Sequence, residues 1–300
     1  MPDAILKQVI GSWEPRFVAN GVDMNDYHWT VDGLERWAEW YGAWMALGKK
    51  HEDMAREAEG EGRAVTAGEA YYRAAIAYHF AVFCWVDDLD EYRAGHARRV
   101  ECYGKALPAL EPPGERVEFP LERITLPAYL RRPPGVARPP VVLFLSGLDS
   151  AKEEHATFER HFLRRGLATL TLDGPGQGET WFKMKMRVDF EVTAAAAIDY
   201  LRSRGDVDGT RVGICGVSLG GYLASRCAAF EPRLKAAACC GGLHSLEDRP
   251  LSSEFHLRRW LHIWGARDEP DVRARSKGAT LAGAAKNIQM PLIVVHSEKD

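Results

Sequence analysis

From about residue 115 onward, short apolar runs alternate with helical patterns, and this alternation constrains the fold more than any other feature of the chain. The runs are bounded by Pro or Gly and are apolar throughout, which is typical of strands buried on both faces. Strands that alternate with helices form a mostly parallel sheet with helices on both of its faces. The sequence therefore predicts a doubly wound α/β fold with central strands at 139–147, 167–174, 211–218, 235–242 and 291–297.

The N-terminal third has helical periodicity and no convincing strand pattern. Three tryptophans and a tyrosine recur at helical spacing in the stretch 34–50, where they either pack helix against helix or wall a substrate cavity. Thr66-Ala-Gly-Glu69 has the form of a capping box, and a further helix is expected over 88–107 because prolines follow it. We predict a helical domain over 1–112 and an α/β domain over 113–300.

Charge, targeting signals and cysteine usage narrow the class of protein. The formal net charge is only −3, whereas nucleic-acid binders usually carry a clustered basic excess. The N-terminus lacks the pattern of a secretory signal, and the longest apolar run, 74–86, is too short to span a membrane. None of the six cysteines forms a C-x-x-C pair. We expect a cytoplasmic protein with reduced thiols and with neither nucleic acid nor membrane as a partner, compatible with a homodimer.

The segment Gly216-Val217-Ser218-Leu219-Gly220 matches the pattern G-x-S-x-G. An apolar strand ends at this segment and an Ala-rich helix pattern begins after it, which is the context of a nucleophile elbow. The glycines let neighbouring backbone pass without Cβ clashes, and the helix N-terminus favours developing negative charge. The sequence therefore predicts that Ser218 is a catalytic nucleophile.

A serine nucleophile needs a base, and the base needs an orienting acid. Where a nucleophile elbow carries the serine, the chain order is serine, acid, histidine. Asp300 follows the last predicted strand, in the position expected of the acid, and no histidine follows it. We therefore expect the catalytic histidine, with the last strand and helix of the fold, to lie beyond residue 300. Four histidines lie between Ser218 and Asp300, outside this order: His244, His256, His262 and His296.

Two backbone N–H groups are expected to form the oxyanion hole. One belongs to Leu219, the residue after the nucleophile, and the other to Leu148, in the loop after the first central strand. The glycine-rich loop Asp173–Gly178 matches neither a dinucleotide-binding loop nor a phosphate-binding P-loop. No His, Cys, Asp and Glu spacing resembles a zinc site. The sequence predicts no cofactor and no metal.

Five segments, in this order and spacing, resemble one branch of the α/β-hydrolase family. They are LSGLDSAKEE, LDGPGQGET, GVSLGGY, FEPRLKAAACCGG and VVHSEKD. This branch contains 2,6-dihydropseudooxynicotine hydrolase, the FrsA-like esterases and fungal enzymes that shorten polyketides. The resemblance implies cleavage of a C–C bond beside a carbonyl by a Ser-Asp-His triad, with Ser218 as nucleophile and Asp300 as acid. It also implies an assisting acid, matched by Glu247 or Asp248.

Three functions remain open at this stage. The first is a serine hydrolase that cleaves a C–C bond in a ketone, and the second is a carboxylesterase with the same machinery. The third is a non-catalytic scaffold that binds partners through its helical third. For the two enzymes we expect residues 1–112 to act as a lid and the substrate to be a small aromatic or polyketide-like carbonyl compound.

Overall fold

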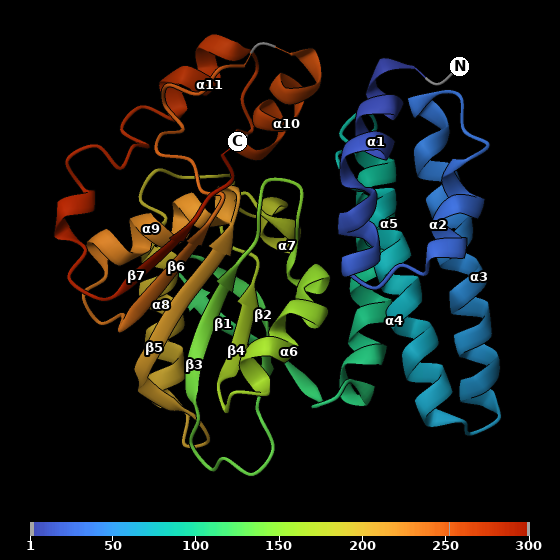
Figure 1. Cartoon of the computed structure of the whole chain (residues 1–300), viewed down its shortest axis with the longest axis horizontal. Helices are drawn as coiled ribbons and strands as arrows, with labels where there is room; N and C mark the ends of the chain where they lie inside the picture. Colours follow the sequence, from blue (N-terminus) through green and yellow to red (C-terminus); the bar gives the residue numbers. More distant parts are fainter. Residues whose placement is uncertain (1–2, 252, 299–300) are drawn as a thin grey trace. The chain divides into compact units, whose positions relative to one another are not determined.

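The computed structural model describes residues 3–251 and 253–298, and the chain forms two compact units (Figure 1). The helical unit contains the residues up to Glu115 together with Glu153–Arg160. The sheet unit contains Arg116–Lys152 and the residues from His161 onward. The first boundary lies three residues after the predicted one. The predicted α/β domain includes the segment Glu153–Arg160, whereas the structure places this segment in the helical unit.

The helical unit is built around a buried cluster of aromatic side chains. Trp40 and Trp44 are fully buried, and the ring of Trp44 stacks on that of Phe17 at a centroid distance of 5.4 Å. Phe80 lies 4.1 Å from the same Phe17 ring. The aromatic residues of 34–50 thus pack helix against helix. The helices are α1 (Ala4–Ala19), α2 (Met24–Val31), α3 (Trp40–Gly60), α4 (Ala64–Ala81) and α5 (Leu89–Ala106), with short 3₁₀ turns η1 (Trp37–Glu39) and η2 (Leu107–Ala109).

The helix starts in this unit differ from the predictions at one place. The capping box predicted at Thr66 is wrong, because α4 begins two residues earlier. Gly62 adopts a φ of 73° that ends the preceding turn. Arg63 then caps the helix, which begins at Ala64, so Thr66 lies exposed in the first turn. The helix predicted over 88–107 is confirmed as α5, with Asp88 accepting hydrogen bonds from the N–H groups of Asp90 and Glu91.

A buried charge network joins Glu153–Arg160 to the rest of the helical unit. Glu154 accepts hydrogen bonds from Arg16 and from Asn20, and its carboxylate lies 3.1 Å from His79 Nε2. The neighbouring Glu153 pairs with Arg99 at 3.2 Å. Both carboxylates are almost completely buried, and buried charges are tolerated only when they are paired in this way.

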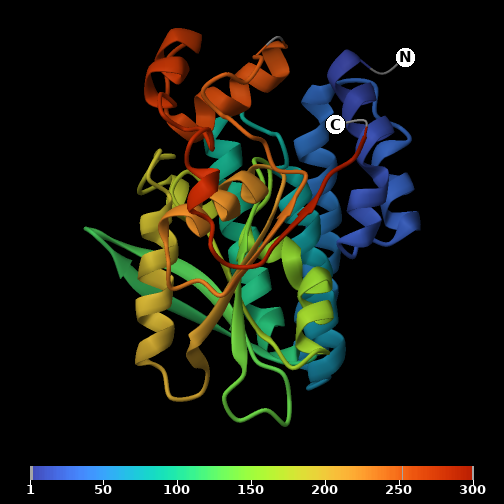
Figure 2. The same cartoon turned by 60° about the vertical axis from the view of Figure 1, so that its left-hand side comes forward.

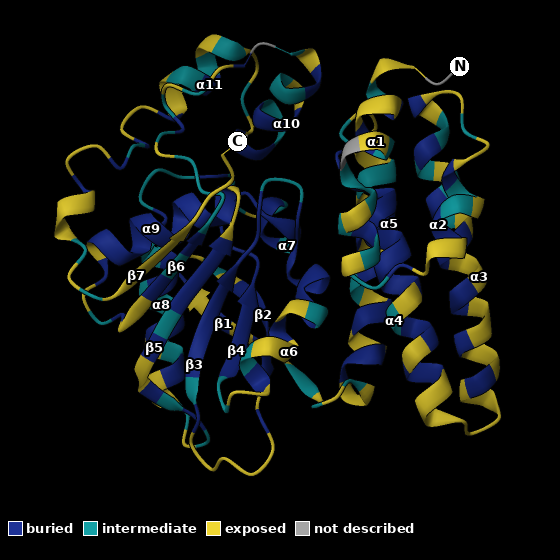
Figure 3. Ribbon diagram, viewed as in Figure 1, coloured by how far each residue is buried: buried dark blue, intermediate teal, exposed yellow. Residues whose placement is uncertain are grey.

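The sheet unit contains a seven-stranded sheet in the order β1-β2-β4-β3-β5-β6-β7. β2 pairs antiparallel with β4, and the remaining pairs from β4 to β7 are parallel. Central strands such as β3 are buried along almost their whole length (Figure 3). The predicted mostly parallel sheet is confirmed, and each of the five predicted runs forms a strand, although β7 lies at the edge of the sheet and is exposed. The strands are β1 (Gly114–Leu121), β2 (Ile124–Arg131), β3 (Pro140–Leu145), β4 (Ala168–Leu172), β5 (Asp208–Val217), β6 (Ala236–Cys240) and β7 (Leu292–Val295).

Parallel register brings the carboxyl ends of the central strands together. Leu145 at the end of β3 is opposite Leu172 of β4 and Gly216 of β5, and Val217 of β5 is opposite Cys240 of β6. The loops that follow these strands therefore meet at one end of the sheet. In open α/β sheets this is the end at which ligands bind.

Helices cover the sheet, and a long insertion precedes its last strand. α8 (Glu191–Ser203) and α9 (Leu219–Phe230) pack against β5 and against each other (Figure 2). The insertion between β6 and β7 carries α10 (Glu254–Trp264), α11 (Glu269–Arg275) and the turn η4 (Ala285–Asn287). The remaining elements are η3 (Lys152–His155), α6 (Ala156–Leu163) and α7 (Gly178–Trp181). Among the described residues, no helix is both long and apolar enough to cross a bilayer.

β7 forms one edge of the sheet and is exposed over its whole length. Its Ile293, Val294 and Val295 side chains are 64%, 61% and 55% exposed. β6 pairs with one side of β7. Apolar side chains on an edge strand are usually covered by another element.

Candidate active site

Ser218 lies at a sharp turn between β5 and α9. β5 ends at Val217 and α9 begins at Leu219, so the serine alone makes the connection. It adopts φ 57° and ψ −122°, a backbone conformation that is costly for a residue with a Cβ and that is concentrated at functional sites. Its N–H donates to the carbonyl of Cys240 at 2.8 Å. The Ser218 side chain is exposed, and its Oγ has no hydrogen-bond partner within 3–251 and 253–298.

Three glycines make this turn possible, because their neighbours leave no room for a side chain. A Cβ on Gly216 would lie 2.0 Å from the carbonyl oxygen of Gly220. A Cβ on Gly220 would lie 2.2 Å from the carbonyl oxygen of Leu145, and one on Gly221 would lie 2.9 Å from Gly242 Cα. These atoms belong to the backbone and cannot move aside. The sequence Gly-Val-Ser-Leu-Gly-Gly is therefore a steric requirement of the local fold.

The two predicted oxyanion donors lie near this turn. Leu219 is the first residue of α9, where N–H groups have no intrahelical acceptor. Leu148 follows Gly147, and a Cβ on Gly147 would lie 3.6 Å from Ser218 Cβ, so the loop 146–150 runs beside the serine. Neither the Leu148 nor the Leu219 N–H donates a hydrogen bond to any described residue, and their role as oxyanion donors remains a prediction.

The glycine-rich loop 173–178 braces the loop beside Ser218. Gln177 Nε2 donates to the carbonyl of Ser146 at 2.6 Å, and Gln177 Oε1 accepts from the N–H of Gly174. Asp173 is fully buried and accepts hydrogen bonds from both the backbone N–H and the ammonium of Lys152. The loop 173–178 therefore lies beside the loop 146–150 and holds it through Gln177.

The buried acidic groups of the sheet unit already have a cation. The Lys152 ammonium is fully buried and lies 2.9 Å from Asp173 and 2.6 Å from Glu179. It also lies 5.0 Å from the centre of the Tyr129 ring. Arg116 also pairs with Glu179, at 2.7 Å, so two cations face these two carboxylates and both carboxylates already have partners in the structure.

The described histidines of the insertion and of the segment after β7 differ in their surroundings. His262 stacks on Trp181 at 4.0 Å, and burial, reinforced by Lys185, lowers its pKa to about 3. His256 bonds to Ser253 at the start of α10, and burial lowers its pKa too. His244 and His296 are exposed. Asp300, the predicted acid, lies outside the described residues.

The two candidates for an assisting acid both make hydrogen bonds within the insertion. Glu247 Oε2 accepts from the N–H of Gly278 at 2.8 Å. Asp248 is exposed and accepts from the hydroxyl of Ser245 at 3.2 Å. Each carboxylate therefore helps to fix the loop after β6, and an assisting role in catalysis remains a prediction for both.

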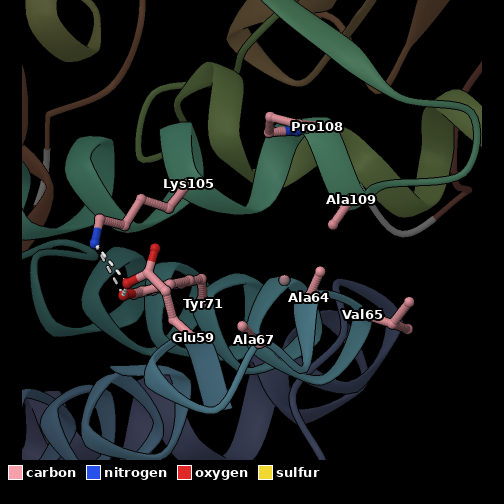
Figure 4. A pocket seen from close by; sticks show the side chains of 10 residues that line it. Glu59, Ala64, Val65, Ala67, Tyr71, Lys105, Pro108 and Ala109 are labelled. Atoms are coloured by element: carbon pink, nitrogen blue, oxygen red, sulfur yellow. Dashed lines mark hydrogen bonds and ion pairs between the residues drawn. The ribbon is translucent and has the colours of Figure 1, made fainter. Parts of the chain in front are cut away.

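A separate pocket of about 480 Å³ lies in the helical unit (Figure 4). One end is polar, where Lys105 donates to the Tyr71 hydroxyl at 2.9 Å and that hydroxyl donates to Glu59 at 2.6 Å. The rest is lined by small apolar residues, among them Ala67 and Ala109. The side chains of Lys105, Tyr71 and Glu59 hydrogen-bond to one another. We therefore assign none of these three groups a catalytic role.

A serine at positive φ between a parallel strand and a helix, with glycines on both sides, defines the α/β-hydrolase fold. The profile of the family described as "Esterase FrsA-like" matches residues 18–253. The chain therefore belongs to the FrsA-like esterase family.

Named relatives agree with this family. The chain is 36% identical over 250 residues to the 2,6-dihydropseudooxynicotine hydrolase of Paenarthrobacter nicotinovorans, a match covering 83% of this chain and 67% of that protein. It is 32% identical to the α/β-hydrolase xenA of Xenoacremonium sinensis, covering 88% of this chain and 65% of that protein. The chain thus spans about two thirds of the length of these relatives.

A solved structure confirms the fold. The crystal structure of 2,6-dihydroxy-pseudo-oxynicotine hydrolase matches with a TM-score of 0.85 and 33% identity, covering 93% of this chain and 79% of that one. The predicted α/β-hydrolase fold with an N-terminal helical region is therefore correct.

Proposed function

We propose that this protein is a serine hydrolase that cleaves a carbonyl compound, and that its reaction is hydrolysis of a C–C bond in a ketone. The observation that carries the proposal is the backbone of Ser218, held at φ 57° between β5 and α9. Strain of this kind persists only where the surrounding structure enforces it. The similarity to 2,6-dihydropseudooxynicotine hydrolase supports the choice of C–C cleavage.

In the proposed reaction Ser218 Oγ attacks the substrate carbonyl carbon while a histidine takes its proton. The carbonyl oxygen becomes an oxyanion, which the N–H groups of Leu148 and Leu219 stabilise. Collapse of this intermediate breaks the C–C bond and leaves an acyl group on the serine, and the proton of the histidinium passes to the departing carbon, directly or through an assisting acid, so that the histidine is neutral again. Water then attacks the acyl group while the histidine takes a proton from that water, and the histidinium returns this proton to Ser218 Oγ as the carboxylic acid product leaves.

The departing carbon needs a proton in this reaction. A leaving carbanion must be stabilised by an adjacent acceptor group and protonated as it departs, and a carboxylic acid can supply that proton. Glu247 and Asp248 are our candidates for this role. An ester does not need such an acid, because an alkoxide leaves more readily.

We propose Asp300 as the acid that orients the histidine, and we propose that the histidine follows Asp300 in the full-length protein. The relatives extend beyond the length that this chain spans, and β7 presents exposed apolar side chains that a further element would cover. As part of the same proposal, the helical unit serves as the lid of the enzyme.

Carboxylesterase activity is the second candidate, and the family match to FrsA-like esterases favours it. A product screen of the full-length protein distinguishes the two. Paired aryl β-diketones and aryl esters are supplied, and the products are identified by mass spectrometry. Cleavage of the diketone to an acid and a ketone supports C–C hydrolysis, whereas turnover of the ester alone supports the esterase. Ser218→Ala should lower kcat by at least about 10³-fold with either substrate.

A further inference from the structure

Four charged or titratable side chains meet beside the loop 146–150. Asp149 belongs to this loop, and Arg259 of α10 pairs with it at 3.2 Å. Both groups are largely buried, with side-chain exposures of 11% and 6%. Arg249 lies on the loop after β6 and stacks over the Trp260 ring at 5.3 Å. His256 completes the group, because Asp149 and both arginines act on its titration.

This group carries more positive than negative charge. The group contains two guanidiniums and a single carboxylate, and that carboxylate pairs with Arg259. Arg249 is half-buried, and its Nε is buried without an acceptor among the described residues. Burial and the charge of Arg259 both lower the pKa of Arg249, which only Asp149 opposes. A buried donor without an acceptor costs about 1–3 kcal/mol, so this guanidinium would gain from an anionic acceptor.

The backbone around Arg249 is held in place. Arg273 of α11 donates through Nη1 to the carbonyl of Arg249 at 2.6 Å and to that of Glu247 at 3.0 Å. Trp260, on which Arg249 stacks, is itself buried. The position of Arg249 is therefore set by two neighbours, and a guanidinium fixed in this way is pre-organised for a planar anion.

The group is also close to Ser218. A Cβ on Gly147 would lie 3.6 Å from Ser218 Cβ, and Asp149 is two residues along the same loop. Consecutive Cα atoms are about 3.8 Å apart, so Asp149 and its partner Arg259 lie within roughly one substrate length of the serine. Arg249 belongs to the same region, because it stacks on Trp260, the residue that follows Arg259 in α10.

We propose that Arg249 binds a carboxylate of the substrate, so that the preferred substrate is a carbonyl compound with a second, anionic end. Arg259 acts as a positioning residue: it holds Asp149, and with it the loop that contains Leu148. Arg249 supplies the charge-assisted hydrogen bonds, for which a guanidinium and a carboxylate match in shape. This inference rests on the proposed function, since it assigns the substrate class of the same site.

A pair of esters tests the proposal in the full-length protein. 4-Nitrophenyl hemiglutarate and 4-nitrophenyl pentanoate share the leaving group and a five-carbon acyl chain, and they differ in one terminal carboxylate. We expect a higher kcat/KM for the hemiglutarate. Arg249→Met should lower the ratio of the two kcat/KM values by about 10- to 100-fold, as expected for loss of a charged hydrogen bond. Arg249→Lys should keep part of this preference.

A matched control separates local binding from overall charge. Arg267 lies in the same insertion and its side chain is 86% exposed, so Arg267→Met removes one positive charge from the surface. It should leave the ratio unchanged. Equal rates for the two esters in the wild type, or the same change of ratio in both variants, would overturn the proposal.

A binding measurement keeps the proposal testable if neither ester is hydrolysed, an outcome that bears on the reaction and not on the carboxylate subsite. Calorimetric titration of the wild type with glutarate should show binding that is at least about tenfold weaker in Arg249→Met. Absence of glutarate binding to the wild type would refute the carboxylate subsite. If Arg249→Met does not fold, Arg249→Gln, which retains donors but no charge, provides the same comparison.

Discussion

Arg16 and Glu154 form a two-pronged ion pair across 138 residues of chain. Arg16 Nε and Nη2 donate to the two carboxylate oxygens of Glu154, each at 2.7 Å. Burial by itself would raise the pKa of Glu154, but the charges of Arg16 and His79 and their hydrogen bonds hold it well below its usual value. Glu154 lies in the segment Glu153–Arg160 of the helical unit, so this pair ties that segment to α1.

We expect Glu154→Gln to destabilise the protein by about 2–4 kcal/mol, because it leaves Arg16 without its anionic partner. Chemical denaturation measures this change. Asp53→Asn is the control, since the pair that it breaks, Lys49–Asp53, is exposed on α3; its effect should stay within about 0.5 kcal/mol. Equal effects of the two substitutions would show that the Glu154 pair contributes no more than a surface pair.

The ion pair of Glu154 with Arg16 could not be predicted from the sequence, whereas the strands and Ser218 could. The strands could be predicted because each is a short apolar run between Pro or Gly, and Ser218 could be found because the steric needs of its turn are written as neighbouring glycines. The sequence Lys152-Glu153-Glu154-His155 instead reads as an ordinary polar helix start. Its burial depends on Arg16 and Arg99, which lie far away in the chain. Likewise, nothing in the sequence joins Asp149 to Arg259.

Because His262 is buried, we expect the stability of the fold to decrease at acidic pH. Its pKa is lowered to about 3 by burial and by Lys185, so it stays neutral in the fold, while the unfolded chain binds a proton near pH 6.5. The unfolded state therefore binds more protons, and stability falls as the pH drops from 6.5 toward 3. His262→Gln should flatten this part of the stability curve, as followed by melting temperature against pH. Substitution of the exposed His161 by Gln should not flatten it.

The backbone around Gly220 leaves no room for a side chain in the turn between β5 and α9, so we expect substitution of this glycine to destabilise the protein. A Cβ at this position would lie 2.2 Å from the carbonyl oxygen of Leu145, so Gly220→Ala must displace β3 or α9. We expect a loss of stability of about 3 kcal/mol or more. At Gly205 a Cβ would meet no atom within 4 Å, and Gly205→Ala should change stability by less than about 1 kcal/mol. Unchanged unfolding of the Gly220 variant would contradict the close approach.

We expect Gln177 to affect catalysis by positioning the loop that contains Leu148. Its Nε2 donates to the carbonyl of Ser146 at 2.6 Å, whereas the carboxylate of Gln177→Glu would face that carbonyl as a second acceptor. The loop that contains Leu148 should then move, and kcat should fall about 10- to 100-fold with a smaller change in KM, since an oxyanion donor acts in the transition state. Gln177→Met, which removes the donor without adding charge, should give a milder loss. A change confined to KM would assign Gln177 to substrate binding instead.

The position of the catalytic histidine can be tested with the 300-residue chain. If the catalytic histidine follows Asp300, the 300-residue chain should hydrolyse 4-nitrophenyl acetate no faster than its Ser218→Ala variant does, because an unassisted serine hydroxyl is a weak nucleophile. Added imidazole can take the place of the missing side chain as a proton acceptor. It should therefore raise the rate of the chain above that of Ser218→Ala measured in the same imidazole, which corrects for hydrolysis by imidazole itself. Serine-dependent turnover without imidazole would instead place the base within residues 1–300. His244→Gln would then be the first variant to assay, because His244 is exposed on the loop that follows β6.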